Sequence, residues 1–300
     1  ANSELQTNWV VATGGVQTPF GAGTNGLGSP VTLGANSILT FYSYNSPATI
    51  AIGSLSGTST TAVVHGESGG SHTINLGGDN SNASYAGIIR DDGSAMGIVK
   101  VGSGTQTFSG ALSYTGPTTV EGGTLILSGT STGAGLVTVN SGTLQLAGPA
   151  GGSPDHGTTV KGDLTINAGG TARLYQHAQI KETSVVTING GLLDFNGWID
   201  GIGRLEMTGG TYANTGSGFI LLNTNTNALT TNAASTTATL NGRVSLRANN
   251  TFTVAAGSVP DGRDAVISGQ IFSDAGGSWG LTKNGAGTLV LSGSNTFSGC

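Results

Sequence analysis

Short stretches of alternating apolar and polar residues, separated by glycine-containing turns, recur along the second half of the chain. Each copy has a β-branched strand, a turn with glycine, and another apolar strand. The copies lie at residues 118–127, 137–146, 164–174, 186–195, 205–212 and 238–246. We expect the aliphatic residues at alternate positions to point inward, and Thr and Ser to face water. Asn and Gly are expected at the corners, where they tolerate left-handed backbone.

The spacing of these copies fits one coil of a β-solenoid. The apolar residues before each turn are separated by 19, 27, 22, 19 and 33 residues; they are Val120, Val139, Ile166, Ile188, Met207 and Leu240. About 20 residues suffice for three short strands and three turns. The longer steps predict coils with loops, for instance at residues 148–157 and 224–237. The Asn- and Thr-rich segment 223–232 could be a polar strand or a loop.

A longer motif occurs twice, at residues 97–110 and 280–293, and each copy is followed by an aromatic-x-Gly triplet. We interpret the matching residues as structural repeat positions; they are Lys100, Gly104 and Gly116 in the first copy and Lys283, Gly287 and Gly299 in the second. A repeat of β-prone runs with fixed glycines predicts stacked coils. A β-sandwich built from hairpins is the alternative, since Asn189-Gly190 is a good hairpin turn.

Composition supports one β-rich chain with many turns. Glycine makes up 54 of 300 residues and only 8% are charged, without the three-residue period of collagen. Helical periodicity is confined to residues 172–182, which we interpret as a loop or lateral protrusion. The net charge of −5 and scattered basic residues argue against nucleic-acid binding. No apolar run reaches the roughly 18 residues of a membrane span.

The one cysteine, Cys300, rules out an internal disulfide and a Cys-based metal site. The first residue is Ala1, with no initiator Met and no signal peptide after it, so we expect a processed or excised segment.

The order of segments 51–57, 73–80, 85–89, 97–110 and 114–125 resembles the autotransporter-associated β-strand repeat, also called the passenger-associated transport repeat. Residues 265–300 begin a second copy. The resemblance implies an all-β fold, a right-handed parallel β-helix that bacteria display or secrete as a passenger. We expect a less regular or capping segment at 1–40 and a β-helix over 41–300 that stops in mid-repeat. The expected location is extracellular or at the cell surface, after export across the outer membrane.

The best candidate ligand site surrounds an aromatic side chain between two carboxylates. Its residues are Asp194, Trp198, Asp200 and Arg204. An aromatic platform with acidic neighbours is typical of carbohydrate recognition, and two carboxylates about 5–9 Å apart could act as acid and base. The simpler interpretation is that exposed acids on a solenoid only aid solubility.

Other polar clusters have weaker claims to a function. Asp91-Asp92 is the densest acidic pair, but Asp274 occupies the matching place in the second copy, which favours a turn former. His65, Glu67 and His72 fit no standard zinc spacing, so we expect solvated loop residues. His156 and His177 are isolated. We therefore predict neither a metal nor a cofactor.

The sequence favours a non-catalytic adhesin or extracellular scaffold that makes many weak contacts. Glycans or host and cell-surface proteins are the expected partners, and self-association is possible. A polysaccharide-cleaving β-helix enzyme is one alternative. A filament or envelope-layer subunit is the other, because open strand edges invite stacking.

Overall fold

The computed structural model describes residues 9–11, 16–17, 29–41, 48–67, 70–151, 157–274 and 276–299. Among these residues every regular element is a β-strand, and all pairs of strands named below are parallel. The residue 1–40 segment, the 148–157 loop, His156 and Cys300 fall wholly or partly outside the described residues. Two units are distinguished, Ala1–Pro149 and Ala150–Cys300.

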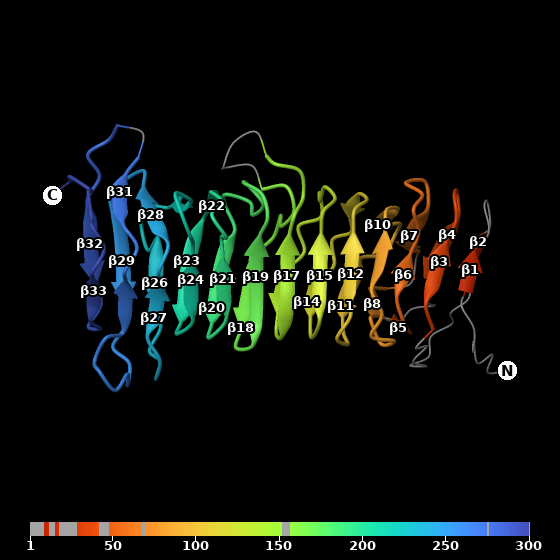
Figure 1. The fold of residues 1–300 in the computed structure, drawn as a ribbon, viewed down its shortest axis with the longest axis horizontal. Helices are drawn as coiled ribbons and strands as arrows, with labels where there is room; N and C mark the ends of the chain where they lie inside the picture. Colours follow the sequence, from red (N-terminus) through yellow and green to blue (C-terminus); the bar gives the residue numbers. More distant parts are fainter. Residues whose placement is uncertain are drawn as a thin grey trace. The chain divides into compact units, whose positions relative to one another are not determined.

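In the first unit, successive coils contribute one strand to each of several parallel sheets (Figure 1). One sheet contains β5 (Ala48–Ile52), β8 (His72–Leu76), β11 (Met96–Lys100), β14 (Thr118–Val120) and β16 (Val137–Val139). The next contains β9 (Ala83–Tyr85), β12 (Thr105–Phe108), β15 (Thr124–Leu127) and β17 (Gly142–Leu146). A third contains β2 (Val16–Gln17), β4 (Ile38–Phe41), β7 (Val63–Gly66), β10 (Ile88–Asp91) and β13 (Leu112–Ser113). Strands β1 (Trp9–Val11), β3 (Val31–Leu33) and β6 (Leu55–Ser56) form a smaller sheet.

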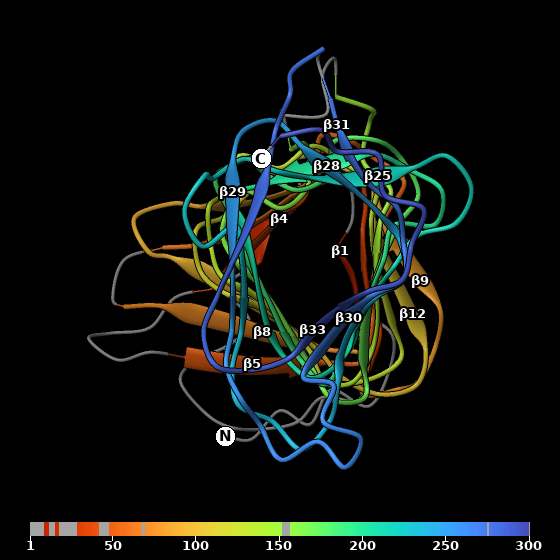
Figure 2. The same cartoon turned by 90° about the vertical axis from the view of Figure 1, so that its left-hand side faces the viewer.

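The second unit repeats this arrangement, and Figure 2 shows β29, β30 and β28 on three sides of its coils. One sheet contains β18 (Leu164–Asn167), β20 (Val185–Asn189), β23 (Arg204–Thr208), β26 (Leu229–Thr231), β29 (Asn250–Val254) and β32 (Leu281–Asn284). Another contains β19 (Gly170–Leu174), β21 (Leu192–Asp194), β24 (Thr211–Ala213), β27 (Ala238–Leu240), β30 (Ala265–Ile267) and β33 (Leu289–Leu291). The third contains β22 (Asp200–Ile202), β25 (Phe219–Leu222), β28 (Arg243–Leu246) and β31 (Ile271–Ser273).

Aligned aliphatic side chains form the core of each unit. Val120 pairs in register with Val139, and Ile188 lies between Ile166 and Met207, all of them fully buried. Full burial of one such side chain is worth about 1.5–3 kcal/mol, so the column of rungs is a main source of stability. Because the pairing is parallel, the predicted solenoid is confirmed and the hairpin alternative is wrong.

The prediction that Leu240 continues the row of apolar residues that contains Met207 is wrong. Leu240 pairs with Tyr212, whereas Met207 pairs with Thr231 in the neighbouring sheet. The expectation of a loop across residues 224–237 is therefore wrong in part, since β26 lies within it. Its inward residues Leu229 and Thr231 are buried, but the surrounding Asn and Thr hide the apolar alternation. The polar-strand interpretation holds for this short stretch.

Two other segments differ in detail from the sequence pattern. Residues 172–182 contain no helix; β19 ends at Leu174, and Ile180 bridges to Val160. Near the start, β3 pairs with β6 and β4 with β7, so coil pairing already includes residues 31–41. The boundary at residue 40 stays a prediction.

Candidate functional site

The four residues of the predicted ligand site do not all come together: Asp200 and Arg204 lie apart from Asp194 and Trp198. Asp200, the first residue of β22, is fully buried. Its Oδ2 accepts hydrogen bonds from the backbone N–H groups of Gln179, at 2.8 Å, and Ile180, at 2.9 Å. Arg204 is exposed at the start of β23, where its Nε lies 2.8 Å from Oε1 of Glu206. Asp200 therefore braces the preceding coil from inside, while Arg204 lies on an outer sheet face.

Asp194 takes part in a different network on the surface. It pairs in register with Arg173, and its Oδ2 lies 3.2 Å from the Nε of Arg173. The inward neighbours Ala172 and Leu193 are fully buried, so alternation directs both charged side chains outward. Asn196 completes the network: its Oδ1 accepts from Arg173 at 2.6 Å, and its N–H donates to Asp194 at 2.8 Å.

A tight turn connects this network to Trp198. Asn196 has φ of 51° and Gly197 has φ of 89°, a left-handed conformation that these two residue types adopt readily. Trp198 lies edge-on to the imidazole of His177, with ring centroids 4.8 Å apart. The Nδ1 of His177 accepts the backbone N–H of Ile199 at 3.0 Å, which fixes the ring against the turn.

Tyr175 lies next to the same network. Its side chain is exposed, and the Arg173 guanidinium carbon lies 5.7 Å from its ring centroid. We call the set of Arg173, Tyr175, His177, Asp194, Asn196 and Trp198 the β19–β21 surface. Sequence reasoning found Asp194 and Trp198 but missed the other four members. The number of residues in one coil could have indicated Arg173, because residues that are one coil apart lie side by side and Arg173 pairs with Asp194 in this way.

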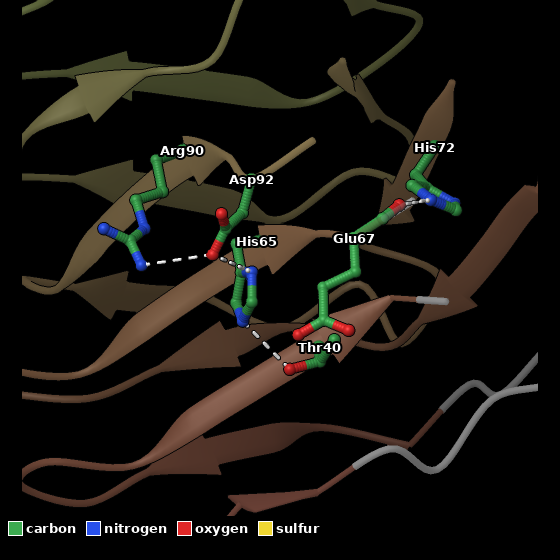
Figure 3. Close-up of polar contacts among 6 residues, drawn as sticks. All are labelled: Thr40, His65, Glu67, His72, Arg90 and Asp92. Atoms are coloured by element: carbon green, nitrogen blue, oxygen red, sulfur yellow. Dashed lines mark hydrogen bonds and ion pairs between the residues drawn. The ribbon is translucent and has the colours of Figure 1, made fainter. Parts of the chain in front are cut away.

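His65, Glu67 and His72 do not converge on one site (Figure 3). His65 is on β7, where its Nε2 lies 2.9 Å from Oγ1 of Thr40 and its Nδ1 lies 3.1 Å from Oδ2 of Asp92. The Nε2 of His72 instead lies 2.9 Å from the backbone oxygen of Glu67. The two imidazoles therefore have separate partners.

Both imidazoles are buried, so the expectation of solvated loop residues is wrong for His65 and His72. Each is on a strand, and the Gly-rich sequence between them favours a loop over two strand ends. Burial lowers the pKa of His65, although the nearby Asp92 and Glu67 carboxylates oppose this shift and Arg90 adds to it. No group of three or more His, Cys, Asp or Glu side chains suited to a metal occurs in the described part of the chain.

Asp91 and Asp274, which the sequence favours as turn formers, each contact a nearby turn and a neighbouring coil. Asp91 accepts the N–H of Met96 at 2.8 Å, and its other oxygen accepts the N–H and hydroxyl of Thr115 at 3.0 and 2.6 Å. Asp274 accepts the N–H of Gly277 through its backbone carbonyl. Its carboxylate lies 3.2 Å from the Nε of Arg247.

The repeat glycines lie where the preceding coil approaches too closely for a side chain. A Cβ at Gly104 would lie 2.1 Å from the backbone oxygen of Ser81, and one at Gly116 would lie 2.2 Å from that of Met96. At the matching positions of the second copy, a Cβ at Gly287 or Gly299 would lie 2.3 Å from a backbone atom of the preceding coil. Space between coils therefore accounts for these glycines.

Lys100 is the repeat residue with the most unusual surroundings. It is fully buried at the end of β11, where its Nζ donates to the carbonyls of Val101 and Gly102 at 2.5 and 3.2 Å. Burial lowers the pKa of Lys100, and the Asp79 carboxylate opposes that shift. Lys283 on β32 is exposed and donates to Gly285 at 2.6 Å.

A family model described as Passenger-associated-transport-repeat matches residues 98–126, 122–146 and 281–299. The first and last matches contain both sets of repeat lysines and glycines. No curated protein and no solved structure matches the chain. The predicted resemblance is confirmed: the repeat matches and the stacked parallel coils fit an autotransporter passenger-like protein. Searched over its described residues, the structure contains no helix that is both long and apolar enough to cross a membrane.

Proposed function

We propose that this chain, with its passenger-associated transport repeats, is part of an exported bacterial surface or secreted passenger that acts as a non-catalytic adhesin or extracellular scaffold. The observation that carries this proposal is the regular outward display of polar side chains. On one sheet of the second unit, Thr165, Thr187, Glu206 and Thr230 occupy successive register positions. Parallel strands lie about 4.8 Å apart, so such columns present hydrogen-bonding groups at a fixed spacing.

Regular display favours adhesion through many weak contacts. Each hydroxyl or amide contributes little by itself, because water competes for the same hydrogen bond. Contacts that are held at fixed positions add without a new ordering cost for each one. The buried aliphatic rungs supply the rigidity, and the outward residues are free to vary.

The arrangement gives little support to the polysaccharide-cleaving alternative. Cleavage needs two carboxylates that face one glycosidic bond across about 5–9 Å. Asp200 is fully buried and accepts backbone hydrogen bonds, so it is not presented to a substrate beside Asp194. Asp194 itself is ion-paired with Arg173.

Adhesion by the purified chain tests this proposal. Fluorescent beads coated with the chain are incubated with epithelial cells, bacterial cells and matrix-coated plates. We expect several-fold more attachment than for beads coated with a protein of equal net charge, and loss of attachment after the chain is unfolded on the bead. Attachment at the control level to all three targets overturns an adhesive role. Release of reducing ends from polysaccharides by the chain overturns the non-catalytic assignment.

A further inference from the structure

We propose that the β19–β21 surface is a binding site for a neutral pyranose unit of a glycan. This inference rests on the proposed adhesive function and assigns it a place and a ligand class. The surface combines one exposed and one half-buried aromatic ring, a charge-balanced set of hydrogen-bonding groups, and a backbone turn that fixes their positions. The aromatic rings can contact the apolar C–H face of a sugar, and the polar groups can bind its hydroxyls.

Tyr175 supplies the exposed aromatic face. In the described part of the chain, the large hydrophobic side chains classed as exposed are Tyr175, Leu136 and Leu291. The Tyr175 side chain is 36% exposed, so part of its ring lies in water beside the Arg173 guanidinium and is accessible to a ligand. The C–H face of a pyranose is apolar and flat, so it can cover such a ring. Trp198 offers a second, half-buried ring on the same surface.

Asp194, Arg173 and Asn196 supply polar groups that match the hydroxyls of a sugar. The Asp194 side chain is 19% exposed and that of Arg173 is 42% exposed, so both can still be reached by a ligand. Carboxylate oxygens have more than one acceptor position, and guanidinium has five donors. Two adjacent sugar hydroxyls can therefore add to the existing network without breaking it.

Three further donors on this surface remain uncommitted among the described residues. They are the Tyr175 hydroxyl, the Trp198 indole N–H, and the Nε2 of His177. Because Nδ1 of His177 accepts a backbone N–H, the neutral ring carries its proton on Nε2. Sugar hydroxyls both donate and accept, so a surface with free donors beside a carboxylate suits them.

Charge balance selects a neutral sugar. The positive charge of Arg173 is paired with Asp194 at 3.2 Å, so the cluster has no unpaired cation for a uronate or sialate. An acidic sugar would also meet the Asp194 carboxylate, with repulsion that weakens binding. A neutral hexopyranose has neither problem.

The backbone of the surface is already held in its binding geometry. Ala178, directly after His177, has φ of 56°, which is an uncommon conformation for a residue with a Cβ. It is kept in place by full burial. Strain of this kind clusters at ligand sites, where it holds side chains ready for binding. The Asn196-Gly197 turn fixes Trp198 in the same way, since Asn214 accepts the N–H of Gly197 at 2.7 Å.

A glycan array with the fluorescently labelled full chain tests the proposal. The array carries oligosaccharides of glucose, galactose, mannose and N-acetylglucosamine, together with uronate- and sialate-containing ones. The best neutral ligand is then titrated by calorimetry at up to about 10 mM, since single-sugar sites bind in the millimolar range. We expect binding to neutral glycans, and at least tenfold weaker binding by Tyr175→Ala and by Trp198→Ala.

Two controls separate binding from folding. Leu136→Ala removes another exposed apolar side chain, in the first unit, and we expect unchanged affinity. Tyr175→Phe retains the ring and is expected to keep more affinity than Tyr175→Ala. Circular dichroism must show unchanged strand content in every variant.

The proposal is overturned if no neutral glycan binds, if only acidic glycans bind, or if Tyr175→Ala and Trp198→Ala bind as the unaltered chain does. Cell attachment that persists in both variants, combined with any of these results, would leave the adhesive function standing and reject this site. Loss of glycan binding without loss of strand content supports the site.

Discussion

The side-chain ammonium of Lys100 donates a hydrogen bond across 3.3 Å to the backbone carbonyl of Gly122, one coil further along the chain. The same group also bonds to Val101 and Gly102 at its own corner. Each corner carbonyl is thereby given a partner inside the stack, where an unpaired one would be costly. Lys100 therefore ties two successive corners together.

Replacement of Lys100 with Ala should destabilise the first unit. The change removes three hydrogen bonds and leaves a cavity, so we expect a loss of about 2–4 kcal/mol in the free energy of unfolding. Lys283→Ala is the matched control, because this residue has the same repeat position but is exposed. We expect the control to change stability by less than about 0.5 kcal/mol. Urea unfolding, monitored by circular dichroism, measures both changes in stability. Equal effects of the two substitutions would contradict the proposal that Lys100 links two successive corners.

Gly104→Ala should be strongly destabilising for a steric reason. The new Cβ would lie 2.1 Å from a backbone oxygen of the preceding coil, which cannot move without shifting that coil. We expect a loss of at least about 2 kcal/mol. A Cβ at Gly78 would have no neighbouring atom within 4 Å, so Gly78→Ala should change stability by less than about 0.5 kcal/mol. Thermal unfolding compares the two, and a Gly104→Ala protein as stable as Gly78→Ala would refute the close-approach argument.

His65 should make stability depend on pH. Burial lowers the pKa of His65 below 6.5, so the unfolded chain takes up a proton more readily than the folded one. The stabilising contribution is fully present above about pH 6.5, and it is lost as the pH falls through 6.5 toward the lower folded value. We expect the urea concentration at the unfolding midpoint to decrease as the pH is lowered from 7 to 5. His65→Gln should flatten this part of the pH profile.

Asp92→Asn provides the control for the same titration. The Asp92 carboxylate opposes the lowering of the His65 pKa, so its removal should lower that pKa further. The pH dependence of stability should then become steeper below pH 6.5. If His65→Gln and the unaltered chain show the same profile, another group is responsible for it.

Much of the fold could be predicted from alternation and spacing. Val120 and Val139 are β-branched residues of strands before a Gly turn, and the register pairs them. Thr231 does not follow this alternation: it is a polar residue that points inward, in a segment of low complexity. A period-2 pattern cannot be detected when both faces are polar. For the same reason, the spacing of apolar residues places Leu240 in line with Met207, whereas it pairs with Tyr212.

The candidate site was less predictable because it depends on register between coils. Asp194 and Asp200 are close in sequence, yet one points outward and the other is enclosed. A coil corner between them changes the direction of the chain, which linear spacing does not reveal. Arg173 lies beside Asp194 only through the pairing of β19 with β21. Sequence spacing alone gives that pairing to within a residue or two.

Asp200 should prove to be a structural residue and not a ligand-binding or catalytic one. Its carboxylate accepts the N–H groups of Gln179 and Ile180, and Asp200→Ala would leave both without this acceptor in a buried place. We expect a loss of about 2–4 kcal/mol in the free energy of unfolding of the second unit. Asp200→Asn keeps one acceptor oxygen and should lose less. Both variants are compared by urea unfolding and, at a temperature where each is folded, by glycan and cell binding. Because Asp200 is enclosed, folded Asp200→Asn should bind as the unaltered chain does, and selective loss of binding at full strand content would assign it a direct role.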